Sequence, residues 1–494
     1  MIRPSATGRY PFYVSVELRE LLDRVARFLN DRGVVAYLVG GFVRDGFLGR
    51  HTNDVDLVVS TPALPLAREL ALSLGGHFVS LHQEHQVARV VVTTGEDALG
   101  KLKVWHLDLA TAAGDIEQDL ARRDFTINAV AIGLGGGEPV DLVGGLADLE
   151  RRCVRAVSPG VFRDDAARLL RAVRLAAELG FQVEESAAAF IRAEAHLLAG
   201  VAGERLREEL MRLLSVPVAA PGVRSMDRLG LLSHLLPEMD AARGVEQPKE
   251  HHWDVFHHSL ETVAAADFLM GEADGFPAWA REDFPWPPEA ADRMNEGVAG
   301  FPRRALFKLA CLLHDVAKPQ TKALQPDGRT RFLGHPHLGA QMSLHALGRL
   351  RFSRREAETV SAMITHHLRP TQMSQGDIPT RRAIFRFLRD TGEVADDVLY
   401  LSLADHLASR GPELILEGWR YHTRVVAHVL QQRLLQEAAP PTRLLTGHDI
   451  MAAFGIEPGP WVGRLLEIVE EAKAAGEVST RKQALALVRK ELGE

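Results

Sequence analysis

The sequence of 494 residues contains only two cysteines, and it contains no long uninterrupted apolar run. Cys153 and Cys311 lie far apart with no metal-type spacing, so we expect reduced, buried thiols. There is no stretch of about 18 apolar residues that would suggest a membrane span, and no basic-then-apolar leader. We therefore expect a cytoplasmic protein without a membrane partner.

The sequence also lacks an excess of positive charge, since 58 Lys and Arg stand against 65 Asp and Glu and the formal net charge is −7. This argues against a uniformly basic nucleic-acid binder, but not against one whose Lys and Arg are concentrated on one face. With 46% hydrophobic and 25% charged residues, the composition is that of a globular protein. The length is sufficient for several domains with cores of their own.

The most informative stretch of the sequence lies between residues 34 and 60. Val34 to Val39 has the apolar, β-branched composition of a short strand, Gly40 and Gly41 interrupt it, and residues 42–48 have helical spacing. These features predict a glycine turn at the N-terminus of a helix. Such a turn can cradle a triphosphate on its backbone N–H groups.

Asp54 and Asp56 open a second predicted strand in the same stretch. Because side chains alternate along a strand, both carboxylates are expected on one face. Two neighbouring carboxylates repel each other unless a cation joins them, and a two-Mg²⁺ site for nucleotide transfer requires such shared oxygen ligands. An isolated Asp-x-Asp is usually a solvated strand edge, but the preceding Gly-Gly-x-Val-Arg-Asp at 40–45 favours the metal site.

This combination resembles the first motif of the class II tRNA nucleotidyltransferases and bacterial poly(A) polymerases in order, spacing and residue type. These families belong to the polymerase-β superfamily, so the resemblance implies an α+β head built on a mixed sheet with helices. It also implies that Asp54 and Asp56 are catalytic and bind Mg²⁺. The nucleotide-binding residues that it implies in this stretch are Gly40, Gly41, Arg44 and Asp45.

The rest of the head, which is expected to end near residue 155, reads as further helices and strands. Apolar spacing predicts helices over 16–29 and 65–74 and strands over 78–81, 88–93 and 103–109. In the last of these strands, His106 and Asp108 share the face opposite to the apolar residues. Asp108 is therefore a possible third carboxylate beside the metals, and a salt-bridged or solvated residue is an equally good alternative.

A second family motif matches residues 119–131, where polar groups interleave with an apolar run. Arg122 and Arg123 are suited to hold phosphates. Asp124 and Asn128 are suited to hydrogen-bond a ribose, which would select ribonucleotides without reading the base. The alternative is an ordinary charged helix start that Asp124 caps.

The neck, about 156–245, is expected to be all-helical, and residues 162–181 read as one helix. Asp165, Arg168 and Arg171 fall on adjacent turns of that helix and can share a face. An acidic and a basic group on a rigid helix can hydrogen-bond the Watson–Crick edge of an incoming base. The family uses a Glu-Asp-x-x-Arg motif in this way, and Asp164 here replaces the usual Glu. A surface ion pair is the alternative.

Histidines gather in the third predicted domain, about 246–435, in a pattern that resembles the HD phosphohydrolase superfamily. Imidazole and carboxylate together suit a divalent transition metal. Such a centre hydrolyses phosphate esters, and Lys318 is a possible phosphate contact. His257 and His366, adjacent to two of the candidates, leave the register open by one residue. By the resemblance, the core ligands are His258, His314, Asp315 and Asp405, and the auxiliary ligands are His335 and His367.

Two further segments complete the domain plan. Within the third domain, residues 270–302 are rich in Pro, Trp and acidic residues, and we expect them to form a surface excursion. The last segment, 436–494, follows a Pro-Pro boundary and reads as a helical tail that is suited to bind tRNA. Its His448-Asp449 pair is expected to cap a helix rather than bind a metal.

The order of head (1–155), neck (156–245), HD-type domain (246–435) and tail (436–494) is that of bacterial CCA-adding enzymes. The resemblance therefore implies transfer of CMP, and potentially AMP, from CTP and ATP to a tRNA 3′ hydroxyl, with release of pyrophosphate. Two alternatives stay open. One is a poly(A) polymerase, which shares the head motifs, and the other is an HD phosphohydrolase with an RNA-binding head.

One family feature is missing from the sequence. CCA-adding relatives carry a flexible loop rich in Arg, Glu and Tyr between the first two motifs, and only residues 110–119 separate the predicted strand from Leu120. Relatives without this loop include enzymes that add two cytidines and leave the adenosine to a separate A-adding enzyme. We therefore hypothesise CC-adding specificity, with full CCA addition as the rival.

Overall fold

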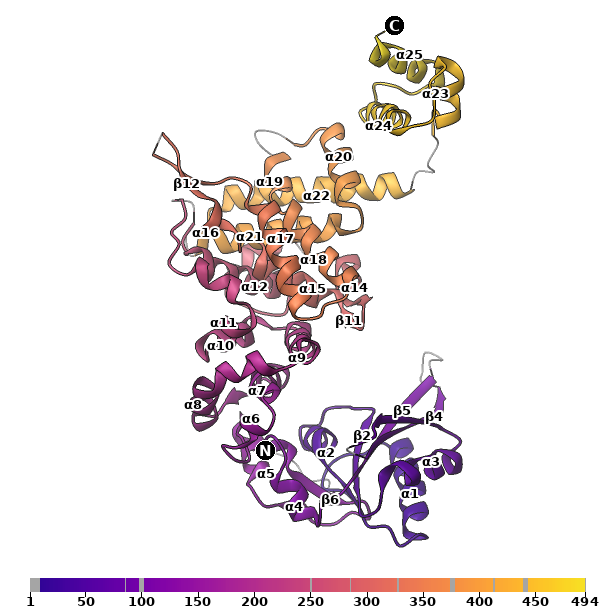
Figure 1. Ribbon diagram of the computed structural model, residues 1–494, viewed down its shortest axis with the longest axis vertical. Coiled ribbons are helices and arrows are strands. Elements are labelled where there is room, and N and C mark those ends of the chain that lie inside the picture. The colour runs from indigo at the N-terminus through magenta and orange to yellow at the C-terminus, as the bar shows by residue number, and fades with distance from the viewer. Residues whose placement is uncertain are drawn as a thin grey trace. The chain divides into compact units, whose positions relative to one another are not determined.

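The computed structural model describes residues 9–493 except 85, 97–101, 249–250, 285, 327, 374–377, 412–413 and 439–442. The chain divides into two compact units, one formed by Met1–Val201 with Arg228–His234 and the other by Ala202–Asp227 with Leu235–Glu494. Figure 1 shows the chain and labels many of its helices and strands. In the described part of the chain, no helix is both long and apolar enough to cross a membrane.

The first unit is built on a seven-stranded mixed sheet with the order β3-β4-β5-β2-β1-β6-β7. β2 and β5 are parallel, and the other neighbouring pairs are antiparallel. The predicted α+β head is confirmed. The strands are β1 (Ala36–Leu38), β2 (Asp54–Val59), β3 (His77–His82), β4 (Val87–Glu96), β5 (Leu102–Thr111), β6 (Val130–Gly133) and β7 (Val140–Asp141).

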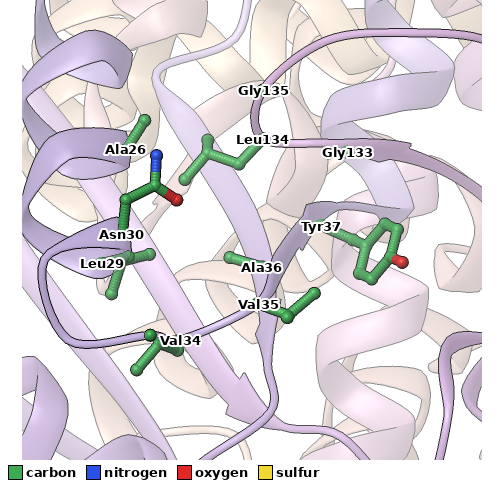
Figure 2. Close-up of a pocket in the computed structure, with 11 residues that line it drawn as sticks. Ala26, Leu29, Asn30, Val34, Val35, Ala36, Tyr37, Gly133, Leu134 and Gly135 are labelled. Atoms are coloured by element: carbon green, nitrogen blue, oxygen red, sulfur yellow. The ribbon is translucent and has the colours of Figure 1, made fainter.

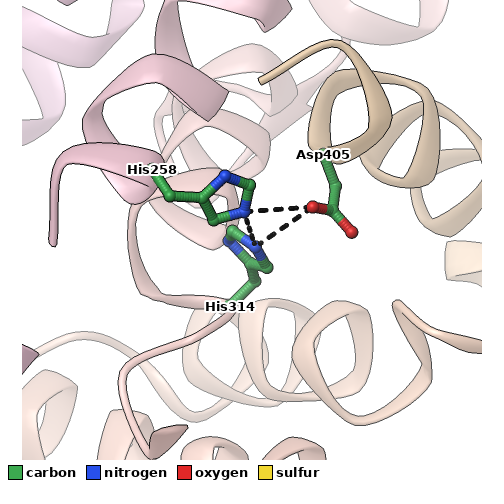
Figure 3. A group of neighbouring side chains, drawn as sticks. All are labelled: His258, His314 and Asp405. Atoms are coloured by element: carbon green, nitrogen blue, oxygen red, sulfur yellow. Dashed lines mark hydrogen bonds and ion pairs between the residues drawn. The ribbon is translucent and has the colours of Figure 1, made fainter. Parts of the chain in front are cut away.

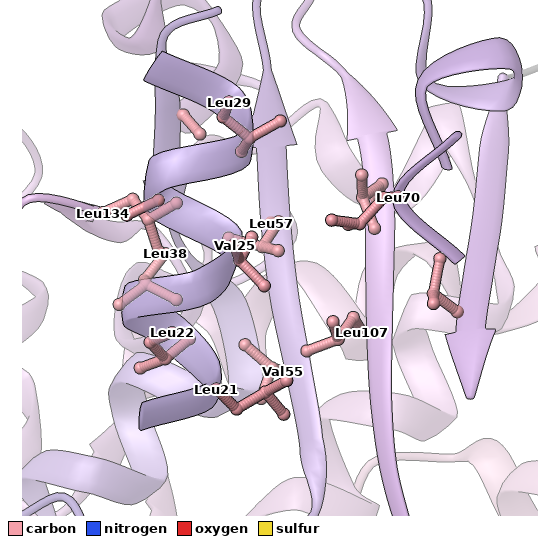
Figure 4. Close-up of a cluster of buried hydrophobic side chains, with 14 of the residues drawn as sticks. Leu21, Leu22, Val25, Leu29, Leu38, Val55, Leu57, Leu70, Leu107 and Leu134 are labelled. Atoms are coloured by element: carbon pink, nitrogen blue, oxygen red, sulfur yellow. The ribbon is translucent and has the colours of Figure 1, made fainter. Parts of the chain in front are cut away.

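Helices α1 (Val16–Asn30) and α3 (Ala63–Leu74) supply the apolar cover of this sheet. α1 begins after Ser15, whose hydroxyl accepts a hydrogen bond from Leu18 N at 3.2 Å. Its buried residues share one apolar cluster with Val55 and Leu57 of β2 and Leu107 of β5 (Figure 4). Because strand residues alternate between faces, this packing directs the neighbouring acidic residues of β2 to the opposite face. The buried residues of α1 are Leu18, Leu21, Leu22, Val25, Ala26, Phe28 and Leu29.

A surface cavity of about 390 Å³ lies between α1, β1 and the residues after β6 (Figure 2). Its lining is mainly apolar, and only Asn30 and Tyr37 bring polar side-chain groups to it. None of the predicted site residues lines this cavity. It therefore offers no group of side chains suited to catalysis.

The remaining elements of the first unit include the neck helix, and here one prediction is wrong. Residues 162–181 do not form one helix, because Asp165 is extended, with φ −152° and ψ 101°, and separates α6 from α7. Its Oδ1 accepts a hydrogen bond from Ala167 N at 3.2 Å, so this carboxylate satisfies a donor at the start of α7. These elements are α2 (Gly40–Phe47), α4 (Ile116–Ala121), η1 (Thr126–Asn128), α5 (Gly145–Arg151), β8 (Cys153–Val154), α6 (Val161–Asp164), α7 (Ala167–Leu179), β9 (Gln182–Val183), α8 (Glu185–Glu194), η2 (Ala195–Gly200) and α11 (Leu231–Leu235).

The second unit is mainly helical. At its centre α12 packs against α15 and α21, and α15 and α21 both contact α18. Its helices and strands before the tail are α9 (Gly203–Ser215), α10 (Ala220–Arg228), η3 (Pro237–Ala242), α12 (Val255–Leu269), α13 (Ala278–Asp283), α14 (Pro288–Asn295), β10 (Gly297–Val298), β11 (Phe301–Pro302), α15 (Arg303–Leu313), α16 (Lys318–Thr321), β12 (Lys322–Leu324), β13 (Thr330–Phe332), α17 (His335–Arg349), α18 (Arg354–His366), α19 (Arg369–Met373), α20 (Arg381–Thr391), η4 (Gly392–Val394), α21 (Ala395–Arg410) and α22 (Leu416–Ala438).

The segment 270–302 is more than the surface excursion that its composition suggested. It contains α13, α14 and the β10–β11 hairpin, and it contacts the helical body through polar groups. Trp419 Nε1 donates to Ala280 O at 2.9 Å, and Arg293 Nη2 lies 3.0 Å from Asp397 Oδ2. Its buried residues are spread among polar ones, so no periodicity in the sequence shows them. These residues are Ala280, Phe284, Ala290, Met294, Val298 and Phe301.

The tail consists of α23 (Gly447–Phe454), α24 (Pro460–Ala474) and α25 (Arg481–Leu492), which share a small apolar core. Asp449 caps α23, as expected. Its Oδ2 accepts from Thr446 N at 2.7 Å, and Asp449 N donates to Thr446 Oγ1 at 3.2 Å. Both cysteines are free thiols, with Cys311 buried and Cys153 half-buried.

Candidate functional site

Asp54 and Asp56 lie on the face of β2 that is turned away from the apolar core. Between and after them, Val55 and Leu57 are buried. The parallel register of β2 and β5 places Asp56 opposite Asp108. Burial raises the pKa of the Asp56 carboxyl, the Phe42 N–H opposes this, and the neighbouring Asp108 carboxylate adds to it. This excess of negative charge in a half-buried oxygen-rich site fits a hard divalent cation such as Mg²⁺.

Asp108 is held in an ion pair with Arg89 of β4. The guanidinium meets both carboxylate oxygens, with Nε 2.7 Å from Oδ1 and Nη2 2.8 Å from Oδ2. Arg89 Nη2 also lies 3.5 Å from Asp54 Oδ1, and His106 Nδ1 lies 2.9 Å from the same oxygen. Within the described part of the chain, Asp54, Asp56 and Asp108 do not form a group whose ligand atoms all lie within 4.8 Å of one another. In this conformation the three carboxylates are therefore not gathered around one point.

The glycine turn lies directly against Asp56. Gly40 has φ +65°, a conformation that favours glycine, and a Cβ at this position would lie 2.9 Å from Asp56 Oδ2. Phe42 N donates to the same carboxylate oxygen at 3.4 Å. α2 begins at Gly40, two residues before the predicted start, so the glycines form its first turn. The backbone N–H groups at this helix start lie beside the carboxylate where a cation–phosphate pair would bind.

A chain of hydrogen bonds joins the first motif to the second motif and to the neck. Arg44 Nη1 donates to Asn128 Oδ1 at 2.9 Å, and Asn128 Nδ2 donates to Asp124 Oδ1 at 3.1 Å. Arg171 of α7 completes the chain, with Nη1 3.2 Å from Asp124 Oδ2. Three segments that are far apart in the sequence thus bring their candidate residues together.

The other candidates of these motifs have different surroundings. Arg123 Nη2 lies 2.9 Å from Asp119 Oδ2, and Arg44 Nε lies 2.9 Å from Asp45 Oδ1. The side chain of Arg122 is 63% exposed and 3.8 Å from Asp119. A Cβ at Gly40 would lie 3.2 Å from Arg123 Nη1 and 2.9 Å from Asp56 Oδ2, so of the two neighbouring arginines it is Arg123 that lies beside the acidic centre.

Asp165 and Arg168 lie close together at the start of α7. Arg168 Nε is 3.9 Å from Asp165 Oδ2, and Arg168 Nη1 donates to Val161 O at 3.2 Å. Both side chains are half-buried, at 23% and 19% exposure. The break at Asp165 therefore preserves the predicted pairing of an acidic and a basic group.

In the second unit, the predicted HD ligands form two groups of three whose ligand atoms lie within 4.8 Å of one another. In the first group (Figure 3), His258 Nε2 is 3.0 Å from Asp405 Oδ1 and 3.2 Å from His314 Nε2. In the second group, His335 Nε2 is 3.2 Å from Asp315 Oδ1, and His367 Nε2 is 3.3 Å from His335 Nε2. Adjacent Asp315 and His314 link the two groups, because Asp315 Oδ2 is 3.2 Å from His314 Nε2.

The hydrogen bonds around these histidines fit a transition-metal centre. The Nδ1 atoms of His314, His335 and His367 lie 2.8, 2.6 and 2.7 Å from backbone carbonyls, so each Nδ1–H can donate and leave an Nε2 lone pair. Burial, with His314 nearby, lowers the pKa of His367 to about 3, so this imidazole is neutral at pH 7. This combination of nitrogen and carboxylate donors suits a divalent transition metal.

Neighbouring histidines in the HD-type domain have different surroundings in the structure. His258 and His367 belong to the two groups, whereas His257 is 56% exposed and hydrogen-bonds Asp254. Sequence reasoning missed His251, whose ring centroid lies 5.6 Å from that of His258. His251 precedes α12 in a segment without periodicity, so no pattern could place it. Lys318 Nζ lies 2.6 Å from Asp315 Oδ2, beside the second group.

Comparison with known proteins gives matches to four successive segments of the chain. The family models are the poly A polymerase head domain over 36–155, the probable RNA and SrmB-binding site of polymerase A over 180–243, the HD domain over 255–410, and the putative tRNA nucleotidyltransferase domain 2 over 442–488. The A-adding tRNA nucleotidyltransferase of Deinococcus radiodurans is 36% identical over 92% of this chain and 95% of that protein. The chain belongs to the tRNA nucleotidyltransferase family.

Other members of the tRNA nucleotidyltransferase family are similar over nearly the whole chain. The CC-adding enzyme of Thermus thermophilus is 35% identical over 92% of this chain and 93% of its own. A CCA-adding enzyme in its apo form has a TM-score of 0.65 at 22% identity, covering 97% of this chain and 95% of the other. The Thermotoga maritima CCA-adding enzyme complexed with tRNA has a TM-score of 0.61 at 22% identity, covering 97% and 96%. The family and fold class that the sequence motifs implied are both confirmed.

Proposed function

We propose that this protein adds CMP from CTP to the 3′ end of tRNA, with Mg²⁺ at Asp54 and Asp56. The observation that carries the proposal is the position of the Asp56 carboxylate, against the glycine turn of α2 and opposite Asp108. Relatives that are 35% and 36% identical over most of their length are named CC-adding and A-adding tRNA nucleotidyltransferases. Poly(A) polymerase activity is the alternative, because the family model that matches residues 36–155 is that of the poly A polymerase head domain.

The proposed reaction joins the tRNA 3′ oxygen to the α-phosphorus of CTP and breaks the bond to the β-phosphate, so pyrophosphate leaves. Mg²⁺ held by Asp54 and Asp56 would neutralise the phosphates and activate the attacking hydroxyl. The helix start at Gly40 and Gly41 would bind the triphosphate through its N–H groups. Arg44, on the same helix, would add a positive charge and orient the nucleotide.

The second motif and the neck would select the nucleotide. Asp124 and Asn128 form one hydrogen-bonded pair and would offer the acceptor and donor groups that bind a ribose. Asp165 and Arg168 would pair with the Watson–Crick edge of cytosine. Arg171 contacts Asp124, so it would couple the base-reading segment to the ribose-binding segment.

The HD-type domain supports a second proposed activity, metal-dependent hydrolysis of a phosphate ester. The donors of the two histidine and aspartate groups suit a divalent transition metal, which would activate water when bound. Lys318 lies beside Asp315 and would contact a substrate phosphate. This activity would be independent of the acidic site on β2, since the two sites share no residue.

His314→Ala is expected to lower the transition-metal content of the purified protein by at least about half, because it removes a ligand that links the two groups. Metal content is measured by inductively coupled plasma mass spectrometry. Hydrolysis of a phosphomonoester or a 2′,3′-cyclic phosphate should be lost, while CMP addition stays within about twofold.

His257→Ala is the matched control for this variant, because His257 is exposed and outside both groups. Unchanged metal content in His314→Ala would contradict the ligand assignment. Loss of both activities, with the fold intact by circular dichroism, would mean that the two domains act as one site.

The connection between β5 and α4 supports CC-adding specificity. β5 ends at Thr111 and α4 begins at Ile116, so residues 112–115 alone join them. Ala112 N donates to Val59 O at 2.8 Å, and Asp115 Oδ1 accepts from Gln118 N at 2.8 Å, so both ends of this connection are fixed. Chain that spans at most about 3.5 Å per residue cannot swing far from such anchors. We therefore infer that the site does not change from cytosine to adenine during the reaction.

On a tRNA that lacks all three terminal nucleotides, purified protein given CTP and ATP is expected to stop after two cytidines. ATP addition to a tRNA ending in CC should be slower than CMP addition by at least about a hundredfold. Denaturing gels with each labelled nucleotide measure both rates. Completion of CCA would contradict the inference drawn from the short β5–α4 connection. Addition of adenosine alone would indicate A-adding specificity, for which the Deinococcus radiodurans relative is named. Long adenosine tails on unstructured RNA would favour the poly(A) alternative.

A further inference from the structure

Arg89 lies beside Asp54 and Asp108, and the proposed reaction gives it no role. It belongs to β4, and the antiparallel register places it directly opposite Asp108 of β5. Its guanidinium forms a bidentate ion pair with that carboxylate, with Nε 2.7 Å from Oδ1 and Nη2 2.8 Å from Oδ2. The side chains of Arg89 and Asp108 are 30% and 19% exposed, so the pair is partly shielded from water. Such a fork fixes the guanidinium in one orientation.

The same guanidinium also faces a proposed metal ligand. Arg89 Nη2 is 3.5 Å from Asp54 Oδ1 and 2.8 Å from Asp108 Oδ2, so one nitrogen lies between two carboxylates. His106 Nδ1 lies 2.9 Å from the same oxygen of Asp54. Asp54 is thus engaged by two nitrogen-bearing groups of neighbouring strands, although its side chain is 56% exposed.

We propose that Arg89 is the internal counter-ion of the acidic centre, which compensates Asp54 and Asp108 until a divalent cation takes its place beside Asp54. The inference rests on the proposed metal site at Asp54 and Asp56. Asp108 holds the Arg89 guanidinium in place through the ion pair. The guanidinium then lies close enough to Asp54 to compete with a divalent cation for that carboxylate. Arg89 is therefore a positioning residue that sets the metal concentration at which the centre assembles.

The physical reason is the sign of the charges. A guanidinium next to a ligand oxygen repels an arriving divalent cation, and it also lowers the repulsion among the carboxylates when no cation is present. Among the described residues, removal of the positive charge should leave Asp54 in contact with His106 alone and should raise the affinity for the cation. An ordinary cross-strand ion pair, by contrast, would stabilise the sheet and leave the metal affinity unchanged.

The test uses the full-length chain and the variants Arg89→Met and Arg89→Lys, with Mn²⁺ alone as the probe. The electron paramagnetic resonance signal of free Mn²⁺ measures how much Mn²⁺ the protein binds. The Mn²⁺ ions that the unmodified protein binds and the Asp56→Asn variant does not are assigned to the acidic centre. Arg32→Met is the matched control, since Arg32 pairs with Glu69 on the same domain. The Mg²⁺ concentration at half-maximal CMP addition provides a second readout.

We expect Arg89→Met to bind Mn²⁺ about threefold to tenfold more tightly and to shift the Mg²⁺ midpoint downward by a similar factor. The Mn²⁺ affinity and the Mg²⁺ midpoint of Arg89→Lys and Arg32→Met should stay within about twofold of those of the unmodified protein. Arg89→Lys keeps the positive charge, and Arg32→Met removes a charge that is distant from the centre. Unchanged or weaker Mn²⁺ binding in a folded Arg89→Met protein would overturn the inference while leaving the metal site in place. If Asp56→Asn loses no Mn²⁺, the proposed metal site fails, and the inference fails with it.

Discussion

Asp54→Ala and Asp56→Ala are each expected to reduce CMP addition by at least about a thousandfold, with the affinity for tRNA within about twofold of the unmodified protein. Both substitutions remove carboxylates that we propose as metal ligands from the polar face of β2, and neither side chain contributes to the apolar core of the head. The loss should therefore fall on the chemical step rather than on the RNA-binding surface.

Single-turnover addition of labelled CMP and a tRNA filter-binding assay measure these two effects separately. Asp31→Ala is the matched control, because Asp31 is an exposed carboxylate at the end of α1 and should give normal addition. Addition at the normal rate by Asp54→Ala or Asp56→Ala would rule out the proposed metal site. A parallel loss of tRNA binding would instead point to damage in the fold of the head.

Lys308→Met is expected to destabilise the centre of the second unit by about 3–5 kcal/mol, since it leaves a buried charge without its partner. Lys308 and Asp267 are both fully buried, and Lys308 Nζ lies 2.8 Å from Asp267 Oδ1. The same ammonium group donates to Val216 O and Pro217 O, each at 2.7 Å. Burial raises the pKa of Asp267, and the Lys308 charge opposes this rise. One side chain thus forms an ion pair with a buried carboxylate and donates hydrogen bonds to two backbone carbonyls.

Hydrogen–deuterium exchange of α12 and α15 peptides measures this local loss of stability. The double variant Lys308→Met, Asp267→Asn should recover part of it, because the amide is neutral and can still accept the hydrogen bond that Ala220 N donates to Asp267 at 2.8 Å. Lys322→Met, at an exposed position on β12, is the control and should change stability by less than about 0.5 kcal/mol. A loss below about 1 kcal/mol in Lys308→Met would mean that the surrounding helices compensate the carboxylate in another way.

Much of the head could be predicted because its signals are local. The spacing of apolar residues indicated α1, and the two-residue alternation in β2 placed Asp54 and Asp56 together on the polar face. The glycine turn could also be located, since a positive φ at Gly40 needs a residue without Cβ. Residue type and family pattern predicted six HD ligands, and the structure brings the six candidates together in two groups of three.

Other features needed the tertiary structure. The break at Asp165 depends on whether its carboxylate or the backbone accepts hydrogen bonds from the first N–H groups of α7. The spacing of apolar residues is the same in a continuous and in a broken helix, so the sequence pattern does not show the break. The choice of His258 over His257 depends on which side of α12 is buried, and α12 is apolar nearly all round. The packing of segment 270–302 on Trp419 and Asp397 joins residues more than 100 positions apart.

The family and the α+β head were readable from the amino-acid order, because local periodicities and motifs carry them, and the same motifs named the candidate residues that we propose for the two centres. The folded chain was needed to see that Arg89 reaches Asp54 and Asp108, that Arg171 reaches Asp124, and that six HD ligands divide into two groups. Strand register and helix packing set these contacts, and both arise from the burial of side chains that are distant in the chain.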